Sequence, residues 1–129
     1  MRAFAEKLWE RAKTALSAAE HDLPVSCDAA ASRAYYAAFF AVSALFALEG
    51  KQFSKHSAVN AAVHRDLVRA GRWTSDLGRD YSYLMSTRDV SDYGGMRSVS
   101  LEEAKECLAS ARRILGAVIE VFEDTGRSS

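Results

Sequence analysis

The sequence predicts an all-α protein, an up-and-down bundle of four long helices plus one shorter helix. Three observations lead to this fold class. The 129 residues have the length of one domain, the apolar residues recur at steps of three and four, and Pro24, Gly50 and Gly71 separate the periodic segments. No run alternates with the period of a strand. We expect a single domain over residues 1–124, followed by a flexible tail at 125–129.

The first two expected helices flank Pro24. The first covers Arg2 to about Glu20, and its apolar stripe consists of Phe4, Leu8, Ala12, Ala15 and Ala19. The second runs from Ser26, a good N-cap residue, to Leu48. Because this helix is apolar almost all round, we expect it at the centre of the bundle. Its charge-free part spans roughly 22 Å, less than the ~30 Å of a hydrocarbon core, so we interpret it as a buried helix and expect no membrane contact.

Three further helices are expected after Gly50. The third spans about Ser57–Ala70, and the fourth runs from a Thr74 cap to near Val90. One face of the fourth carries Leu77, Tyr81, Leu84 and, at its end, Arg88. The last helix begins at a capping box, Ser100-Leu101-Glu102-Glu103. Its stripe continues through Ala104, Leu108, Ala111, Leu115, Val118 and Phe122.

Charge and cysteine content exclude several classes of protein. Lys plus Arg and Asp plus Glu are 17 each, so the net charge is zero. This balance excludes a protein that coats nucleic acid by bulk charge, or one that holds a membrane surface through a polybasic patch. Cys27 and Cys107 lack a CxxC partner and a nearby histidine, so we expect no metal and interpret them as two buried free thiols, with a disulfide as the alternative. The N-terminus does not resemble a signal peptide, and we expect a cytoplasmic location.

Two clusters in the first half of the chain could carry chemistry. Arg33 opens the charge-free run, where it could contact an anion or pair with Asp89 or Asp92. Alternatively, its aliphatic part packs against the helix and its guanidinium is exposed to solvent. Lys55-His56 precedes the third helix, where backbone N–H groups favour an anion and a histidine could act as acid or base. The alternative is a solvent-exposed or cap-bonded histidine.

A third cluster lies at the end of the fourth helix and in the loop after it. Arg88, Asp89, Asp92 and Tyr93 place one basic, two acidic and one phenolic group within a few residues. An arginine at a helix C-terminus is favoured by the helix dipole alone, and Asp-Tyr-Gly is ordinary turn sequence. The structural and functional interpretations of this cluster both stay open. Phosphate-binding glycine loops and a nucleophile elbow are absent from the sequence.

Together these motifs resemble the HEPN-domain family, and in particular its small stand-alone prokaryotic branch with a RAYYA helix and a late R…DYG element. The matching segments are Ser32-Arg33-Ala34-Tyr35-Tyr36-Ala37-Ala38-Phe39, Lys55-His56-Ser57, Arg88 with Asp92-Tyr93-Gly94, and the long final helix. The resemblance extends from about Leu8 to Phe122. It implies a HEPN-like bundle of four or five helices that forms a homodimer.

The resemblance also implies a function. Many members are encoded beside a minimal nucleotidyltransferase and work with it as a toxin–antitoxin pair, and active members are metal-independent ribonucleases without a cofactor. Their signature is an arginine followed four to six residues later by a histidine, at the dimer interface. Histidine moves a proton of the ribose or the leaving oxygen, and arginine stabilises charge on the phosphorus.

This sequence departs from that signature, because Arg88 matches the arginine but no histidine follows it. We therefore expect a HEPN component that acts as an RNA- or nucleotide-binding or partner-binding dimer, and leave open whether it is an enzyme. The candidate binding residues are Arg33, Lys55, Asp92 and Tyr93. The first alternative is a ribonuclease toxin that uses Arg88 with His56 or Tyr93 in place of the missing histidine. The second is a nucleotide-binding dimer without a role on RNA.

Overall fold

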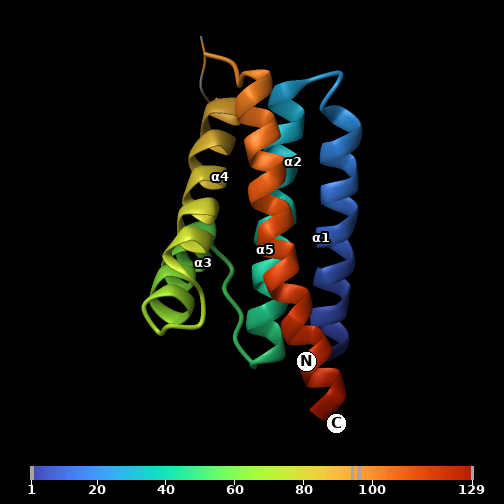
Figure 1. Ribbon diagram of the computed structural model, residues 1–129, viewed down its shortest axis with the longest axis vertical. Helices are drawn as coiled ribbons and strands as arrows, with labels where there is room; N and C mark the ends of the chain where they lie inside the picture. The colour runs from blue at the N-terminus through green and yellow to red at the C-terminus, as the bar shows by residue number, and fades with distance from the viewer. Residues whose placement is uncertain (1, 94, 96, 129) are drawn as a thin grey trace.

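Four long helices and one short one form the bundle in the computed structural model, which describes residues 2–93, 95 and 97–128 (Figure 1). The long helices are α1 (Arg2–Asp22), α2 (Cys27–Leu48), α4 (Ser75–Tyr93) and α5 (Leu101–Ser128). The short helix α3 (His56–Ala62) continues into a π-helical segment, η1 (Val63–Val68). Within the described ranges no residue is in a strand. The expected all-α bundle is confirmed.

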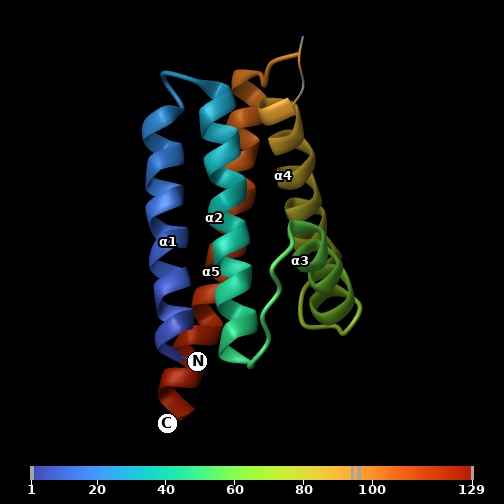
Figure 2. The same ribbon diagram turned by 180° about the vertical axis from the view of Figure 1, so that it is seen from behind.

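Helix α2 occupies the centre. Figures 1 and 2 show α1 and α4 on its two sides, and Figure 2 shows α5 behind it. The side chain of Ser26 caps α2 by accepting a hydrogen bond from the backbone N–H of Ala29, as expected from the sequence. A window of α2 has the mean hydropathy of a membrane span, 1.3, but 61% of that window is buried inside the bundle, which is the position of a core helix.

Alanines control how closely α1 approaches α2. The buried residues of α1 are Ala5, Ala12 and Ala19, one every seventh position, which keeps a single seam against a nearly antiparallel neighbour. The expected stripe is wrong at Phe4, which is 42% exposed. Phe4 lies instead at a surface hollow, which it lines together with Leu8 and Phe40.

The third expected helix changes form halfway. We expected one α-helix over Ser57–Ala70, but α3 ends at Ala62 and a π-helix follows. The close approach of α4 accompanies this change, because a Cβ placed on Gly78 would lie 2.8 Å from a methyl group of Val68. His64 Nε2 and Ser82 Oγ share a hydrogen bond of 3.0 Å across the same contact.

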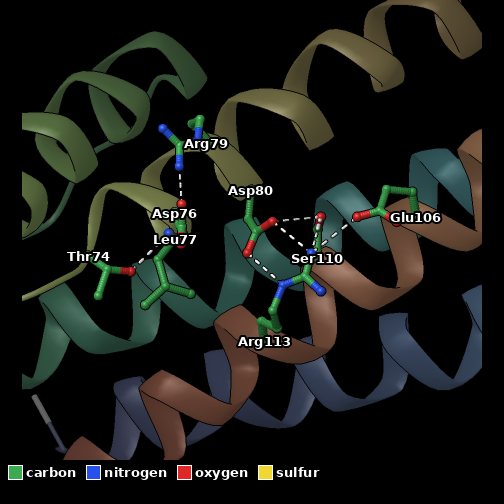
Figure 3. A network of polar contacts seen from close by, with 8 residues as sticks. All are labelled: Thr74, Asp76, Leu77, Arg79, Asp80, Glu106, Ser110 and Arg113. Carbon is green, nitrogen blue, oxygen red and sulfur yellow. Dashed lines mark hydrogen bonds and ion pairs between the residues drawn. The ribbon is translucent and has the colours of Figure 1, made fainter.

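A polar network fixes α4 against α5 (Figure 3). Arg113 donates two hydrogen bonds of 2.9 Å to the carboxylate of Asp80, and Ser110 donates a third of 3.0 Å. Burial opposes ionisation of Asp80, but the hydrogen bonds from Arg113 and Ser110 outweigh it and hold the pKa of this carboxyl below its ordinary value. One helical turn earlier, Asp76 and Arg79 form a pair at the exposed surface.

The start of α5 is tied to the start of α2. The capping box is confirmed, because Ser100 and Glu103 exchange two hydrogen bonds of 3.1 Å. Just before it, the backbone N–H of Val99 donates a hydrogen bond of 2.8 Å to a carboxylate oxygen of Asp28. This bond holds the end of the segment after α4 beside α2. At its other end, α5 extends to Ser128 and so passes residue 124, where we placed the domain boundary.

Both cysteines are free, which agrees with the interpretation from the sequence. Cys107 is buried, and burial raises the pKa of its thiol to about 11. Cys27 is only half-buried, so the expectation of burial is wrong for this residue. The reason is its place at the first position of α2, where the helix emerges at one end of the bundle.

Candidate functional site

Tyr35 is the residue on which the candidate site is built. It lies on α2 with no exposed surface, and its ring lies 6.1 Å from the buried ring of Tyr81 on α4. The guanidinium carbon of Arg88 lies 4.8 Å from the centre of the Tyr35 ring. On α3, Nδ1 of His56 shares a hydrogen bond of 2.6 Å with the Tyr35 hydroxyl. Tyr35 therefore joins residues from three helices.

Arg88 is held inside the bundle end and remains in contact with two carboxylates. It is 8% exposed. Its Nε lies 3.5 Å from Asp89 and a terminal nitrogen lies 3.7 Å from Asp92, one turn further along α4. The Tyr35 ring and the two carboxylates together offset the cost of removing the guanidinium from water. The expected face of α4, which carries Arg88 with Tyr81, is confirmed.

His56 is half-buried between aromatic rings. It stacks on Phe39 with a centroid distance of 4.2 Å and an interplanar angle of 14°, and it meets Tyr36 edge-on at 5.8 Å. Burial, and then the positive charge of Arg88, lower the pKa of this imidazole below its ordinary value. At neutral pH the ring is therefore uncharged, with one nitrogen that donates and one that accepts.

The bond between Tyr35 and His56 links the tautomer of the imidazole to the direction in which the phenol donates. Burial raises the pKa of the Tyr35 phenol, so the hydroxyl keeps its proton at neutral pH. When this hydroxyl donates to Nδ1, the imidazole proton sits on Nε2. In that tautomer Nε2–H is a donor for a ligand; in the other tautomer Nδ1–H donates to the Tyr35 oxygen and Nε2 is an acceptor.

Arg33 and Asp92 line one hollow of about 430 Å³ between α2 and the end of α4. We call it the Tyr36 hollow; its polar and aromatic lining is Asp28, Ser32, Arg33, Tyr36, Ser91 and Asp92. The Arg33 side chain is 56% exposed and its Nε lies 2.8 Å from Asp22 of α1. Of the alternatives for Arg33, the pair with Asp89 or Asp92 is not formed, because the turn before α2 places Asp22 closer; the exposed guanidinium agrees with the alternative of a side chain whose head lies in solvent.

The remaining candidates contribute less. Lys55 is exposed and precedes α3, next to His56. The Tyr93 side chain lies outside the described residues. Within the described part of the chain, no three His, Cys, Asp or Glu residues gather into a group that could hold a metal ion.

Four candidates from the sequence therefore lie around two tyrosines: His56 and Arg88 contact Tyr35, and Arg33 and Asp92 line the hollow beside Tyr36. Sequence reasoning missed Tyr35 as the centre, since two aromatic residues on a central helix are usually core. One signal in the sequence pointed to a partner such as Tyr35. Tyr81 and Arg88 are seven residues apart on the expected buried face of α4, so the guanidinium needed an aromatic or acidic neighbour in the core.

The helical bundle and this arrangement define a small α-helical domain, and the comparisons name its class. The HEPN domain model matches residues 5–121, so the chain belongs to the HEPN domain family. A UPF0332 protein of Thermotoga maritima is 37% identical over 99 residues, which are 77% of this chain and 75% of the relative.

A solved structure has the same fold. The crystal structure of TT1696 from Thermus thermophilus superposes with a TM-score of 0.77 at 24% identity. The match covers 90% of this chain and 96% of that one. The likeness confirms the HEPN-like architecture that we expected from the sequence.

Proposed function

We propose that this HEPN domain protein is the HEPN component of a toxin–antitoxin-like pair with a minimal nucleotidyltransferase, and that it acts as a homodimer which binds RNA or a nucleotide. Membership of the family supports the pairing and the dimer, since the resemblance implies both. The observation that carries the binding role is the Tyr36 hollow, which Arg33 and Asp92 both line and where Asp92 contacts Arg88.

The chemistry of the hollow suits a nucleotide. The exposed guanidinium of Arg33 can exchange Asp22 for a phosphate, which guanidinium binds with two parallel hydrogen bonds. Tyr36 is half-buried and offers a ring for a base to stack on, an interaction of about 1–3 kcal/mol. Ser32, Ser91 and Asp92 supply donors and acceptors for the ribose.

Binding is tested by titrating the protein with AMP, ATP and a short single-stranded RNA in a calorimeter. Arg33→Ala is expected to weaken binding at least about tenfold, because it removes the exposed guanidinium of the hollow. Arg79→Ala is the matched control, since Arg79 pairs with Asp76 on the exposed surface at the far end of α4. With one or two phosphates contacted, the logarithm of the affinity for single-stranded RNA should fall with the logarithm of the salt concentration at a slope of about −0.7 to −1.4.

Two results would contradict the binding role. One is the absence of heat with all three ligands. The other is an equal loss of affinity in Arg33→Ala and Arg79→Ala, since that would indicate a diffuse charge effect. The partnership has its own test: a minimal nucleotidyltransferase encoded beside this gene should copurify with the tagged protein, and an isolated gene without such a partner would count against the pair.

A metal-independent ribonuclease is the second candidate, favoured by the contact of both His56 and Arg88 with Tyr35. Expression should then arrest growth, and Arg88→Ala should abolish the arrest. Because Arg88 is buried and its removal could unfold the bundle end, His56→Gln is tested alongside it. RNA that is bound but left intact by the wild-type protein would exclude the ribonuclease and keep the binding role.

A further inference from the structure

A second hollow adjoins the Tyr36 hollow on the α1 side of α2. It lies between α1 and α2, which Figures 1 and 2 show side by side, and its volume is about 350 Å³. We call it the Arg11 hollow; its polar and aromatic lining is Glu10, Arg11, Thr14, Arg33 and Phe40. Arg33 lines the Tyr36 hollow as well. The two hollows therefore meet at the Arg33 side chain.

Arg11 is an exposed arginine that lies against a ring instead of an acid. Its guanidinium carbon is 5.9 Å from the centre of the Phe40 ring. Among the described residues, no carboxylate lies within ion-pair distance of it, and the adjacent Glu10 pairs with Lys13 at 2.8 Å. An incoming phosphate can therefore bind Arg11 without displacing an ion pair of this arginine.

Arg33 keeps donors available although it is paired. Its Nε donates a hydrogen bond of 2.8 Å to Asp22. For its two terminal nitrogens, the described part of the chain provides no acceptor within hydrogen-bond distance. A guanidinium has five N–H donors, so these two nitrogens can hold a phosphate while Nε stays on Asp22. Because Arg33 belongs to both hollows, that phosphate lies between them.

The two hollows each contain an aromatic ring. Tyr36 lines the first and Phe40 the second, one turn further along α2. Both rings are half-buried, their centres are 6.2 Å apart and their planes are inclined by 36°. Neighbouring bases of an unpaired strand separate and stack on aromatic side chains in succession. A mononucleotide has one base and would leave one of these two rings uncovered.

We propose that the Tyr36 hollow and the Arg11 hollow bind two successive nucleotides of an unpaired RNA strand, with one phosphate on Arg33 and the next on Arg11. The inference rests on the binding role in the proposed function and names the ligand class, which is an RNA strand and not a free nucleotide. The strand then crosses α2 from the α4 side to the α1 side (Figure 2).

The zero net charge of the chain is compatible with this path. Two phosphates need two cations placed at the right spacing, and bulk positive charge is not required. The acid of the Arg11 hollow, Glu10, has a side chain that is 69% exposed and paired with Lys13. Its repulsion of a phosphate is therefore screened by solvent and by its partner.

The test compares AMP with the 5′-phosphorylated dinucleotide pApA by calorimetry on the full-length protein. In the wild type pApA should bind at least about tenfold more tightly than AMP, because the second base stacks on Phe40 and the second phosphate meets Arg11. Arg11→Gln and Phe40→Leu should each reduce this advantage to less than about threefold. The ratio of the two dissociation constants is the readout, since a variant that only loosens the bundle weakens both ligands together.

Arg2→Gln is the matched control. Arg2 is also an exposed arginine of α1 that lies over a ring, with its guanidinium carbon 5.6 Å from the centre of Phe122. It precedes Arg11 by about two and a half helical turns and so points to the opposite side of α1. This variant should keep the full advantage of pApA over AMP.

Three results would overturn part or all of the account. The absence of heat with both ligands overturns the binding role itself. Binding of AMP, with pApA less than about threefold tighter in the wild type, overturns the strand and leaves the binding role intact. A wild-type advantage that survives in Arg11→Gln or in Phe40→Leu, or that is lost equally in Arg2→Gln, overturns the assignment of the second nucleotide to the Arg11 hollow.

Discussion

The hydroxyl of Tyr35 and Nδ1 of His56 lie 2.6 Å apart, although 21 positions separate the two residues in the sequence. The same Tyr35 carries the guanidinium of Arg88 above its ring. An arginine, a tyrosine and a histidine from three helices thus act as one electrostatic unit. The protonation of His56 should report on the integrity of this unit.

The first prediction concerns that protonation. His56 should titrate below the ordinary value of about 6.5, because burial and Arg88 both lower its pKa. Arg88→Met keeps the bulk of the side chain and removes its charge, so the His56 titration should move upward. Imidazole NMR signals followed between pH 4 and 8 give the measurement. A titration that is unchanged in Arg88→Met would show that the arginine does not act on His56.

The sign of the associated stability effect follows from the same shift. The folded chain binds a proton at His56 less readily than the unfolded chain, so folding stability should decrease as pH falls from about 6.5 through the lowered pKa. Above pH 6.5 both states are neutral at this residue and the contribution is constant. His56→Gln should remove this slope from the pH dependence of urea unfolding.

The second prediction compares two aspartates one turn apart on α4. Asp80→Asn should lower the free energy of unfolding by about 1–3 kcal/mol, since Asp80 accepts three charged or polar hydrogen bonds that link α4 to α5. Asp76→Asn should cost no more than about 1 kcal/mol, because the pair with Arg79 is exposed. Urea unfolding of both variants at pH 7 measures the difference.

The effect of Asp80 should also depend on pH. The pKa of Asp80 is lower in the folded chain than in the unfolded chain. Its contribution to the free energy of unfolding is therefore complete above the unfolded-state pKa of about 3.9 and is lost as pH falls through the folded-state pKa. The wild type and Asp80→Asn should therefore converge in stability towards low pH. Curves that stay parallel down to pH 2 would contradict the role of the ionised carboxylate.

The third prediction concerns glycine inside helices. Alanine normally stabilises a helix by up to about 1 kcal/mol relative to glycine, and Gly116→Ala should do so, because no described atom that could obstruct a Cβ lies within 4 Å of its position. Gly78→Ala should instead lower stability by about 1–3 kcal/mol, since its Cβ would meet Val68 at 2.8 Å. Thermal melts of the two variants should shift in opposite directions. Equal stabilisation by both would contradict the close contact between α4 and η1.

The fourth prediction concerns the thiol of Cys107. Its pKa of about 11 leaves little thiolate at pH 8, and the side chain is buried. In a Cys27→Ser background, Cys107 should react with a disulfide reagent only as fast as the chain unfolds, and denaturant should expose it fully. Rapid reaction of the native protein at pH 8 would contradict the burial of this thiol.

Much of the fold could be predicted from the sequence, because it depends on local signals. The caps at Ser26 and Ser100 and the periodicity of the long helices are properties of neighbouring residues. The π-helix could not be predicted in this way. It accompanies the contact of Val68 with Gly78 and the bond between His64 and Ser82, which are made between separate elements.

The candidate site, too, was predictable only in the part that depends on local sequence. Residue types and order pointed to Arg88, His56 and Arg33, but periodicity carries no information on which of them meet. The contact between His56 and Tyr35 forms because the segment after α2 returns alongside that helix before α3 begins (Figure 2). The pairing of Arg33 with Asp22 likewise depends on the tight turn between α1 and α2.

The most direct test of the central claim is a map of amide NMR shifts on addition of AMP and of a short single-stranded RNA. We predict saturable changes at Arg33, Tyr36, His56 and Asp92. We predict none at Arg113, which lies on α5 and donates a hydrogen bond to Asp80 of α4. Changes confined to the α4–α5 side, or no change with either ligand at millimolar concentration, would contradict the assignment of this cluster as the site of an RNA- or nucleotide-binding HEPN domain protein.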